Sequence, residues 1–201
     1  MSKLETNKKR KMDALLENAL ELFTTKGLQE TSISDIVKKA GVAKGTFYLY
    51  FKDKYDLRNI LIAHESSKIF MKAAVRLEKS GILDFEEKII FLVNDIIEQL
   101  NQDKKLLLFI SKNLGWGYFK SALVNSRNED DVDFYMVYQK MLKDSEHPIK
   151  EPEIMLFMIV ELVSSTCYSS ILYNEPVSLS ELKPYLFANI RNIMASHFTE
   201  L

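Results

Sequence analysis

The residues best suited to chemistry lie between Ala43 and Phe51, in the stretch AKGTFYLYF. Phe47 and Phe51 are four residues apart, so they would share one face of a helix over this stretch. The remaining positions carry an ammonium group, a small hydroxyl and two phenols, on Lys44, Thr46, Tyr48 and Tyr50. Groups of these kinds suit a DNA groove and the phosphates beside it. The pattern indicates a helix that is anchored on one face and presents polar groups on another.

A second short helix is predicted directly before this stretch. Ser32 can cap it, because its hydroxyl can accept a hydrogen bond from the backbone N–H of Asp35, whose carboxylate can reach back. The helix should stop at Gly41, since glycine enters a left-handed C-terminal cap without a Cβ clash. The apolar pattern resumes at Val42, which leaves no room for a long loop. Residues 31–54 are therefore predicted to form a helix-turn-helix.

The rest of the chain favours an all-α fold of about nine helices, because period-two alternation never lasts long enough to predict a sheet. An amphipathic helix from Met12 that ends at Gly27 precedes the helix-turn-helix, and a long helix over residues 53–79 follows it. Later helices are expected over residues 84–102, 104–113, 118–124, 132–142, 153–173 and 179–198, with a break at Gly115-Trp116-Gly117. We predict a three-helix N-terminal bundle over residues 1–56 and a larger helical body over residues 57–201.

The charge of the chain is divided between its two ends. The net charge is only −1, but residues 1–58 hold 12 Lys and Arg against 8 Asp and Glu, whereas residues 59–201 hold 15 against 20. A basic head on an acidic body fits a protein that touches phosphate at one end only. Within the head, the run Lys8–Lys11 could be a solvated tail, or it could lie across a phosphate backbone.

Cysteine usage and hydropathy favour the cytoplasm. Cys167 is the single cysteine, so no internal disulfide can form, which is typical of a reducing compartment. The N-terminal sequence MSKLETNKKRK lacks the apolar core of a signal peptide. The most apolar run, residues 154–163, is too short to cross about 30 Å of hydrocarbon. We therefore expect a cytoplasmic protein with no membrane partner.

The chain displays no constellation of residues typical of an enzyme. His64, His147 and His197 are far apart, and none of them stands in a metal-binding spacing. Neither a glycine-rich phosphate loop nor a nucleophile elbow occurs. We expect no enzyme activity, no metal site and no cofactor.

The two C-terminal helices are unusually apolar, which suggests burial against another surface. That surface could be a second copy of the chain, giving a four-helix interface around a two-fold axis. Alternatively, the two helices could simply complete the core of a monomer. We predict the homodimer.

About 60 positions at the start of the chain resemble the TetR family of bacterial transcriptional regulators. The matching residues are Ala19, Leu22-Phe23, Gly27, Thr31-Ser32, Asp35-Ile36, Ala40-Gly41-Val42, Lys44-Gly45-Thr46, Tyr48, Tyr50-Phe51, Lys54 and Leu57. The resemblance covers less than a third of the chain, although the total length and the two apolar terminal helices also fit. It implies a homodimer in which residues 1–56 bind DNA and residues 57–201 bind a ligand and dimerise.

The resemblance implies DNA contacts at Ser32, Lys44, Gly45, Thr46, Tyr48, Tyr50 and Lys54. Lys44 would meet a phosphate, Gly45 would let the backbone approach the sugar-phosphate chain, and Thr46 could reach a base edge. Three positions depart from the family pattern: Ala43, Phe47 and Leu49. The residue before Lys44 is often Ser or Thr, so the methyl of Ala43 removes a helix cap and a phosphate contact. The hold on phosphate should then rest more on Lys44 and the tyrosines.

Aromatic residues and six of the eight methionines of the chain lie in the body, an interior that could leave an apolar cavity open to a ligand. By resemblance the effector would be a small, mostly apolar or aromatic molecule. The residues that we expect to line its site are Phe109, Trp116, Phe119, Tyr138 and Tyr168.

Together these patterns predict a ligand-responsive DNA-binding regulator, a repressor, that binds a near-palindromic double-stranded operator as a homodimer. The alternative is a helical carrier or sensor of an apolar small molecule, with no operator-specific DNA binding. An enzyme built on the helical body is a weaker alternative, because the chain shows no catalytic motif.

Overall fold

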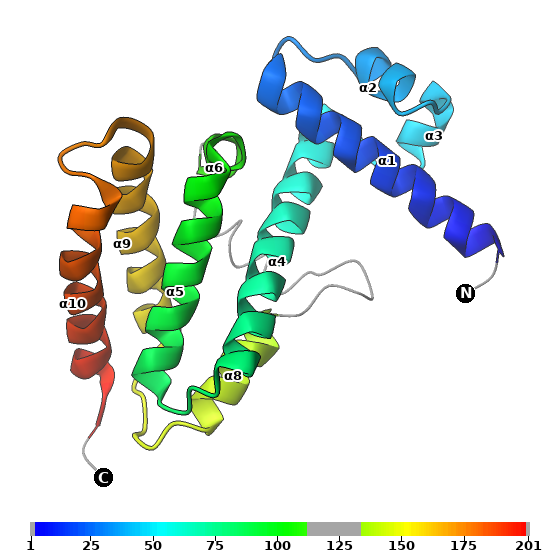
Figure 1. Cartoon of the computed structure of the whole chain (residues 1–201). Coiled ribbons are helices and arrows are strands. Elements are labelled where there is room, and N and C mark those ends of the chain that lie inside the picture. The colour runs from blue at the N-terminus through cyan, green and yellow to red at the C-terminus, as the bar shows by residue number, and fades with distance from the viewer. Residues whose placement is uncertain (1–2, 112–133, 200–201) are drawn as a thin grey trace. The chain divides into compact units, whose positions relative to one another are not determined.

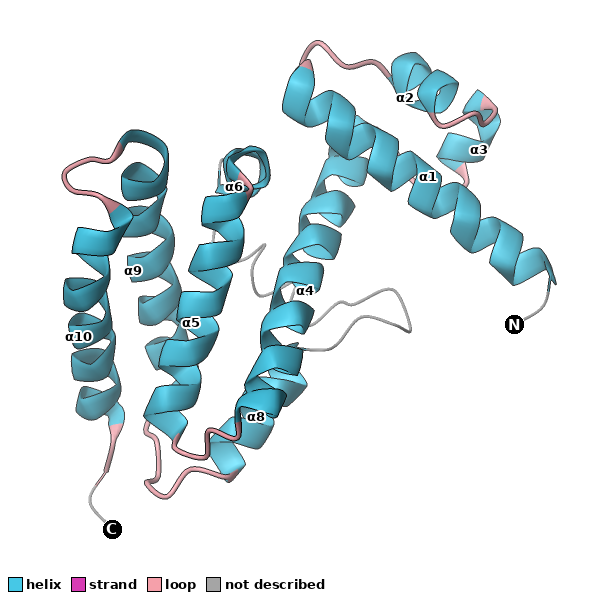
Figure 2. Cartoon of the chain, viewed as in Figure 1, coloured by secondary structure: helices cyan, strands magenta, loops and turns pink. Residues whose placement is uncertain are grey.

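The computed structural model describes residues 3–111 and 134–199 of the 201-residue chain. Within these ranges it contains nine helices and no strand, apart from an isolated bridge between Ile149 and Phe198 (Figure 2). The predicted all-α fold is therefore confirmed. The expected helix over residues 118–124 lies outside the described ranges, as do Trp116 and Phe119.

Most helices begin and end close to the expected residues. In chain order they are α1 (Lys3–Thr25), α2 (Ile33–Lys39), α3 (Lys44–Tyr48), α4 (Lys54–Ser80), α5 (Phe85–Gln102), α6 (Lys104–Ser111), α8 (Phe134–Lys143), α9 (Pro152–Tyr173) and α10 (Leu179–His197) (Figure 1). The first helix starts earlier than expected, at Lys3, so the basic run Lys8–Lys11 is helical and does not form a separate lead.

The helix α3 is shorter than the segment expected over residues 43–51, because it contains only five residues. Its N-cap, Ala43, supplies no side-chain hydrogen bond. At its end, the N–H groups of Tyr50 and Phe51 both donate to the carbonyl of Phe47, each at 3.0 Å. This shared acceptor tightens the last turn, so the chain leaves the helix before Phe51.

The chain divides into two compact units, residues 1–64 and residues 65–201. The helix α4 starts in the first unit and ends in the second. The boundary inferred from the sequence, between residues 56 and 57, stays a prediction.

The first unit is built on large apolar side chains from α1, α2, α3 and the beginning of α4. Those that are fully or almost fully buried include Leu15, Leu16, Ala19, Ile36, Phe47, Phe51, Leu57 and Leu61. Each large side chain of this kind contributes about 1.5–3 kcal/mol relative to exposure. This core fixes the positions from which α3 presents its remaining side chains.

The core of the second unit is built from α5, α9 and α10, with further buried residues from α4, α6 and α8. Polar contacts tie α10 to α5 at two points. Lys183 donates to Asn94 at 2.8 Å and forms an ion pair with Glu98, while Arg191 pairs with Glu86 and Glu87. The contacts between α9 and α10 are the most extensive of any helix pair in the described residues.

The helix α9 is long and apolar enough to cross a membrane, judged by length and composition alone. This corrects the argument made from residues 154–163, because the helix continues through small polar residues as far as Tyr173. A core helix of a globular protein meets the same criterion. In this structure α9 packs against α10, α5 and α6, and Met155, Ile159 and Cys167 are buried in the protein core.

Candidate nucleic-acid interface

The start of α2 is held by a reciprocal cap, as the sequence predicted. The N–H of Asp35 donates to the Ser32 hydroxyl at 3.1 Å, and the N–H of Ser32 donates to the Asp35 carboxylate at 3.0 Å. Lys26 adds an ion pair to the same carboxylate at 2.9 Å. The bond from the Ser32 backbone, together with Lys26 and the Ser32 hydroxyl, lowers the pKa of Asp35 to about 2.

The turn after α2 is closed at Gly41, which has a φ of +67°. The N–H of Val42 donates to the Val37 carbonyl at 3.0 Å, and the N–H of Gly41 donates to the Lys38 carbonyl at 3.3 Å. This pair of bonds is the Schellman arrangement that ends many helices on a glycine. An added Cβ at Gly41 would meet no atom within 4 Å, so the positive φ alone accounts for the glycine.

Beyond the turn, α3 is anchored by the buried face that the sequence predicted. Phe47 is fully buried, and its ring centroid lies 5.4 Å from that of Phe51. Tyr48 packs its ring edge-to-face against Phe47 but remains 54% exposed. Lys44 and Gly45 are also exposed, and Thr46 is half-buried. The outer surface of α3 thus carries an ammonium group, a bare backbone position and a phenol.

Gly45 has no structural requirement within the protein. A Cβ built there would meet nothing within 4 Å, and its φ is not positive. Glycine inside a helix costs about 1 kcal/mol relative to alanine, so its presence here brings no gain to the fold. Because Gly45 has no side chain and is exposed, another molecule could approach the backbone closely at this position.

Two of the expected DNA contacts have partners inside the protein. The Lys54 ammonium donates to the backbone carbonyls of Leu28, Gln29 and Thr31, at 2.9, 3.0 and 3.2 Å. The Tyr50 hydroxyl donates to the carbonyl of Lys8, at 3.2 Å. The Ser32 hydroxyl accepts the capping bond, and its own hydrogen can still be donated. A role in DNA binding at these three positions stays a prediction.

The described residues expected around an effector lie on three helices, α6, α8 and α9, and their role in ligand binding stays a prediction. Tyr138 is buried on α8, and its hydroxyl donates to the Pro152 carbonyl at 2.7 Å. Phe109 is buried on α6, while Tyr168 on α9 lies edge-to-face against Tyr173. Trp116 and Phe119 lie outside the described residues.

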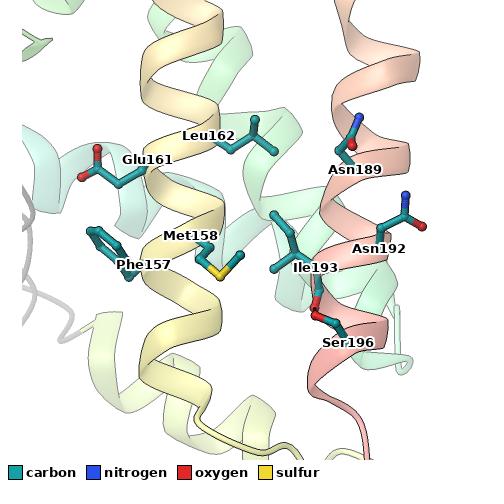
Figure 3. Close-up of a pocket in the computed structure, with 8 residues that line it drawn as sticks. All are labelled: Phe157, Met158, Glu161, Leu162, Asn189, Asn192, Ile193 and Ser196. Atoms are coloured by element: carbon teal, nitrogen blue, oxygen red, sulfur yellow. Dashed lines mark hydrogen bonds between the residues drawn. The ribbon is translucent and has the colours of Figure 1, made fainter.

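A groove on the surface of the second unit runs between α9 and α10. It is lined by Phe157, Met158, Glu161, Leu162, Asn189, Asn192, Ile193 and Ser196. Figure 3 shows Met158 and Ile193 directed into the space between the two helices. Further along α9, Ile154 is 50% exposed, so an apolar strip lies open on this face.

Within the described residues, no three His, Cys, Asp or Glu side chains are grouped so that they could hold a metal ion. His197 is engaged through Nδ1 with the Lys150 carbonyl at 2.7 Å. Cys167 is buried, and this burial raises the pKa of its thiol to about 11. A thiol with such a pKa is a poor nucleophile.

Comparisons with known proteins match this same part of the chain. The family model described as bacterial regulatory proteins, tetR family, matches residues 15–59. An uncharacterised HTH-type transcriptional regulator of Bacillus subtilis, YvdT, is 59% identical over 44 residues, which are 22% of this chain and 23% of that protein. The fatty acid metabolism regulator protein of Bacillus subtilis is 32% identical over 106 residues, or 53% of this chain and 45% of that protein.

These two matches therefore span less than half of each relative's own length. The whole fold is similar to a crystal structure of a TetR transcriptional regulator from Rhodococcus sp. RHA1, with a TM-score of 0.63 at 21% identity. That similarity covers 94% of this chain and 97% of the other. The residues matched by the family model include the capped α2, the Gly41 turn and α3, so this N-terminal part of the chain is similar to the TetR family of bacterial regulatory proteins.

Proposed function

We propose that the chain is a ligand-responsive transcription regulator, a repressor, that binds a near-palindromic DNA operator as a homodimer. The observation that supports this most directly is the outer surface of α3. Lys44, Gly45 and Tyr48 are exposed on a short helix whose other face is fixed by the buried Phe47. A rigid helix with exposed donors and a bare backbone position is suited to a major groove.

Each exposed group on α3 has a distinct role in this proposal. The Lys44 ammonium neutralises a phosphate, and Gly45 lets the backbone come close to the sugar-phosphate chain. Tyr48 donates its hydroxyl to a phosphate oxygen. Thr46 reads a base edge or a thymine methyl, so it contributes preference among sequences.

The homodimer forms through α9 and α10 in this proposal. The exposed apolar side chains Ile154 and Met158, with the groove between the two helices, give a surface that a second copy would cover. Two copies related by a two-fold axis would place two recognition helices in successive major grooves, about 34–36 Å apart. Such a pair reads a near-palindromic site.

The effector in this proposal is a mostly apolar molecule held by the second unit. The similarity to a regulator of fatty acid metabolism, and to the fold of FadR from Bacillus subtilis solved in complex with stearoyl-CoA, makes long-chain acyl-CoA compounds the first class to test. Ligand binding would favour a separation of the two recognition helices that no longer matches the groove spacing. This requires a higher affinity of the ligand for that state than for the DNA-bound state.

The decisive experiment is a gel-shift titration of the protein on the DNA upstream of its own gene, at two salt concentrations. We expect specific binding whose log affinity falls linearly with log salt, because phosphate contacts release counterions. Lys44→Ala should weaken binding to all sequences, whereas Thr46→Ala should change the preference among operator variants. If both variants keep the wild-type affinity and preference, the roles given to α3 are wrong.

The same assay tests the effector and the alternative function. Addition of stearoyl-CoA should release the DNA, whereas coenzyme A alone should not. A chain that binds stearoyl-CoA but shows no preference for any DNA sequence would be a carrier or sensor of apolar molecules, and the regulator proposal would fail.

A further inference from the structure

The first helix extends well beyond the core that it helps to build. Residues 5–10 of α1 are all exposed, and the first buried residue is Leu15. Residues 3–14, called here the α1 extension, span about 18 Å at 1.5 Å per residue. The α1 extension contains five Lys and Arg against one Glu and one Asp. It is therefore a charged helical arm for which core packing gives no reason.

The charge pattern of the α1 extension is unfavourable for the free protein. Lys8, Lys9, Arg10 and Lys11 occupy a single helical turn. Lys8 and Lys11 are three residues apart, a spacing at which like charges on a helix repel one another. In this turn Arg10 donates to the side-chain oxygen of Asn7, a neutral group, at 3.3 Å. A polyanion lying against this turn would remove the repulsion and gain counterion release.

Tyr50 connects this arm to the end of the recognition helix. It lies two residues after α3, and its hydroxyl donates to the carbonyl of Lys8 at 3.2 Å. The ring of Tyr50 also lies 6.1 Å from that of the buried Phe51. Figure 1 shows α1 running past α3 within the first unit, with its N-terminal end beyond that helix. The basic turn is thus held at a fixed place beside α3.

Three other cations of the first unit have partners within the fold. Lys26 pairs with Asp35, Lys39 pairs with Glu21, and Lys54 is held by three carbonyls. By contrast, neither Lys8 nor Lys44 has an acidic partner among the described residues. The backbone of Lys8 is therefore tied by the Tyr50 hydroxyl to the segment that follows α3, the helix on which Lys44 lies.

We propose that the α1 extension is a second DNA-contacting element of this protein. It binds the phosphodiester backbone beside the groove that α3 enters, and Tyr50 is the positioning residue that holds it there. The inference rests on the proposed DNA-binding function and adds a phosphate-binding arm that reads no base. The phosphate contacts of this arm compensate for the contact that is lost because Ala43 has no side-chain hydroxyl.

The test compares the salt dependence of operator binding between matched double variants of the full chain. Lys8→Gln with Arg10→Gln removes two charges from the arm, while Lys72→Gln with Lys105→Gln removes two exposed charges from the second unit. Glutamine keeps a similar helix propensity. We expect the arm variant to lower the slope of log affinity against log salt by roughly 2–4, because a dimer loses four arm charges and each phosphate contact contributes about 0.9. The control variant should keep the wild-type slope.

The outcomes separate this inference from the proposed function. If the wild-type chain binds the upstream DNA and the arm variant keeps its slope, the inference is overturned and the regulator proposal stands. If the wild-type chain binds no DNA, both the arm inference and the regulator proposal are wrong. The exchange Lys8→Arg with Arg10→Lys preserves the charges and should restore the slope, which excludes a loss caused by misfolding.

Tyr50→Phe tests the positioning role, because it removes the hydroxyl and keeps the ring. In the wild-type background it should lower the salt slope in the same direction as the arm variant. In the Lys8→Gln, Arg10→Gln background it should add little, since the charges that it positions are gone. An equal and additive loss in both backgrounds would show that the Tyr50 hydroxyl contacts DNA itself, and the positioning role would be wrong.

Discussion

Lys54 illustrates how one side chain can serve the fold at the edge of a binding surface. Its ammonium donates hydrogen bonds to the carbonyls of Leu28, Gln29 and Thr31, which lie in the connection between α1 and α2. Carbonyls in a short connection have no helical partner, so a cation that donates to three of them fixes the path of the chain. The position of α2, and hence of α3, depends on that path.

We expect Lys54→Met to destabilise the protein by about 1–2 kcal/mol, since it removes charge-assisted bonds and leaves half-buried carbonyls without a donor. For a chain of this length this corresponds to a fall in Tm of roughly 2–8 °C. Thermal unfolding followed by circular dichroism measures the change, with the exposed Lys52→Met as the control. An unchanged Tm together with operator affinity as weak as that of Lys44→Ala would instead make Lys54 a direct DNA contact.

Asp35 offers a test of the cap on α2 through its titration. Its pKa is lowered to about 2, first by the bond from the Ser32 backbone, then by Lys26 and the Ser32 hydroxyl. Because the folded value is below the ordinary value of 3.8, the carboxylate's contribution to stability is complete above that value. It is lost as the pH falls towards 2. Carboxyl NMR titration should show this low pKa, and Ser32→Ala should raise it; an unshifted pKa would contradict the capping geometry.

Residue chemistry could be predicted from the sequence where the partners are local. Ser32 and Asp35 are three residues apart, and Gly41 sits where the apolar stripe ends, so pattern alone located the cap and the turn. The partners of Lys54 and Tyr50 are backbone carbonyls between 23 and 42 residues away. A carbonyl carries no sequence signature, so the structural roles of Lys54 and Tyr50 were not predictable.

Among the elements, α9 shows why composition does not reveal which face of a helix is buried. Apolar residues surround its N-terminal half, so no polar stripe marks the solvent side. The structure buries Met155, Ile159 and Cys167 but leaves Ile154 and Met158 exposed. The same uniformity made the helix resemble a membrane span in length and composition. Only the packing against α10, α5 and α6 distinguishes the two faces.

The burial of one face of α9 predicts the reactivity of its single thiol. Cys167 is 4% exposed, and burial raises its pKa to about 11. We expect the native protein to resist labelling by a thiol-specific disulfide reagent at pH 8, because both access and thiolate are lacking. One thiol per chain should react at once in denaturant. Rapid labelling of the native protein would show that α9 turns a different face to the core.

In the whole molecule, charge and apolar surface are separated along the chain. The first unit carries the net positive charge, with five Lys and Arg in the α1 extension, while exposed apolar side chains occur on α9 in the second. The sequence predicted this division from the charge count and from the two apolar terminal helices. It could not show which apolar residues remain uncovered, because burial depends on contacts between distant helices. Ile154 and Met158 are among the apolar residues that the fold leaves exposed.

This arrangement predicts the oligomeric state and what disrupts it. At micromolar concentration, light scattering should give twice the chain mass of 23.3 kDa. Met158→Asp places a charge in the groove between α9 and α10, where a second copy would have to desolvate it, so we expect a monomer at the same concentration. Met158 is 41% exposed, so the substitution should leave each chain folded.

Leu83→Asp is the matched control for this change, because Leu83 is apolar, 84% exposed and located before α5, away from the groove. It should remain dimeric. The monomeric Met158→Asp variant should also lose operator affinity, since a single recognition helix engages one half-site and the second half-site no longer adds to binding. A wild-type chain that is monomeric at micromolar concentration would refute the dimer, and a dimeric Met158→Asp variant would place the interface on another surface.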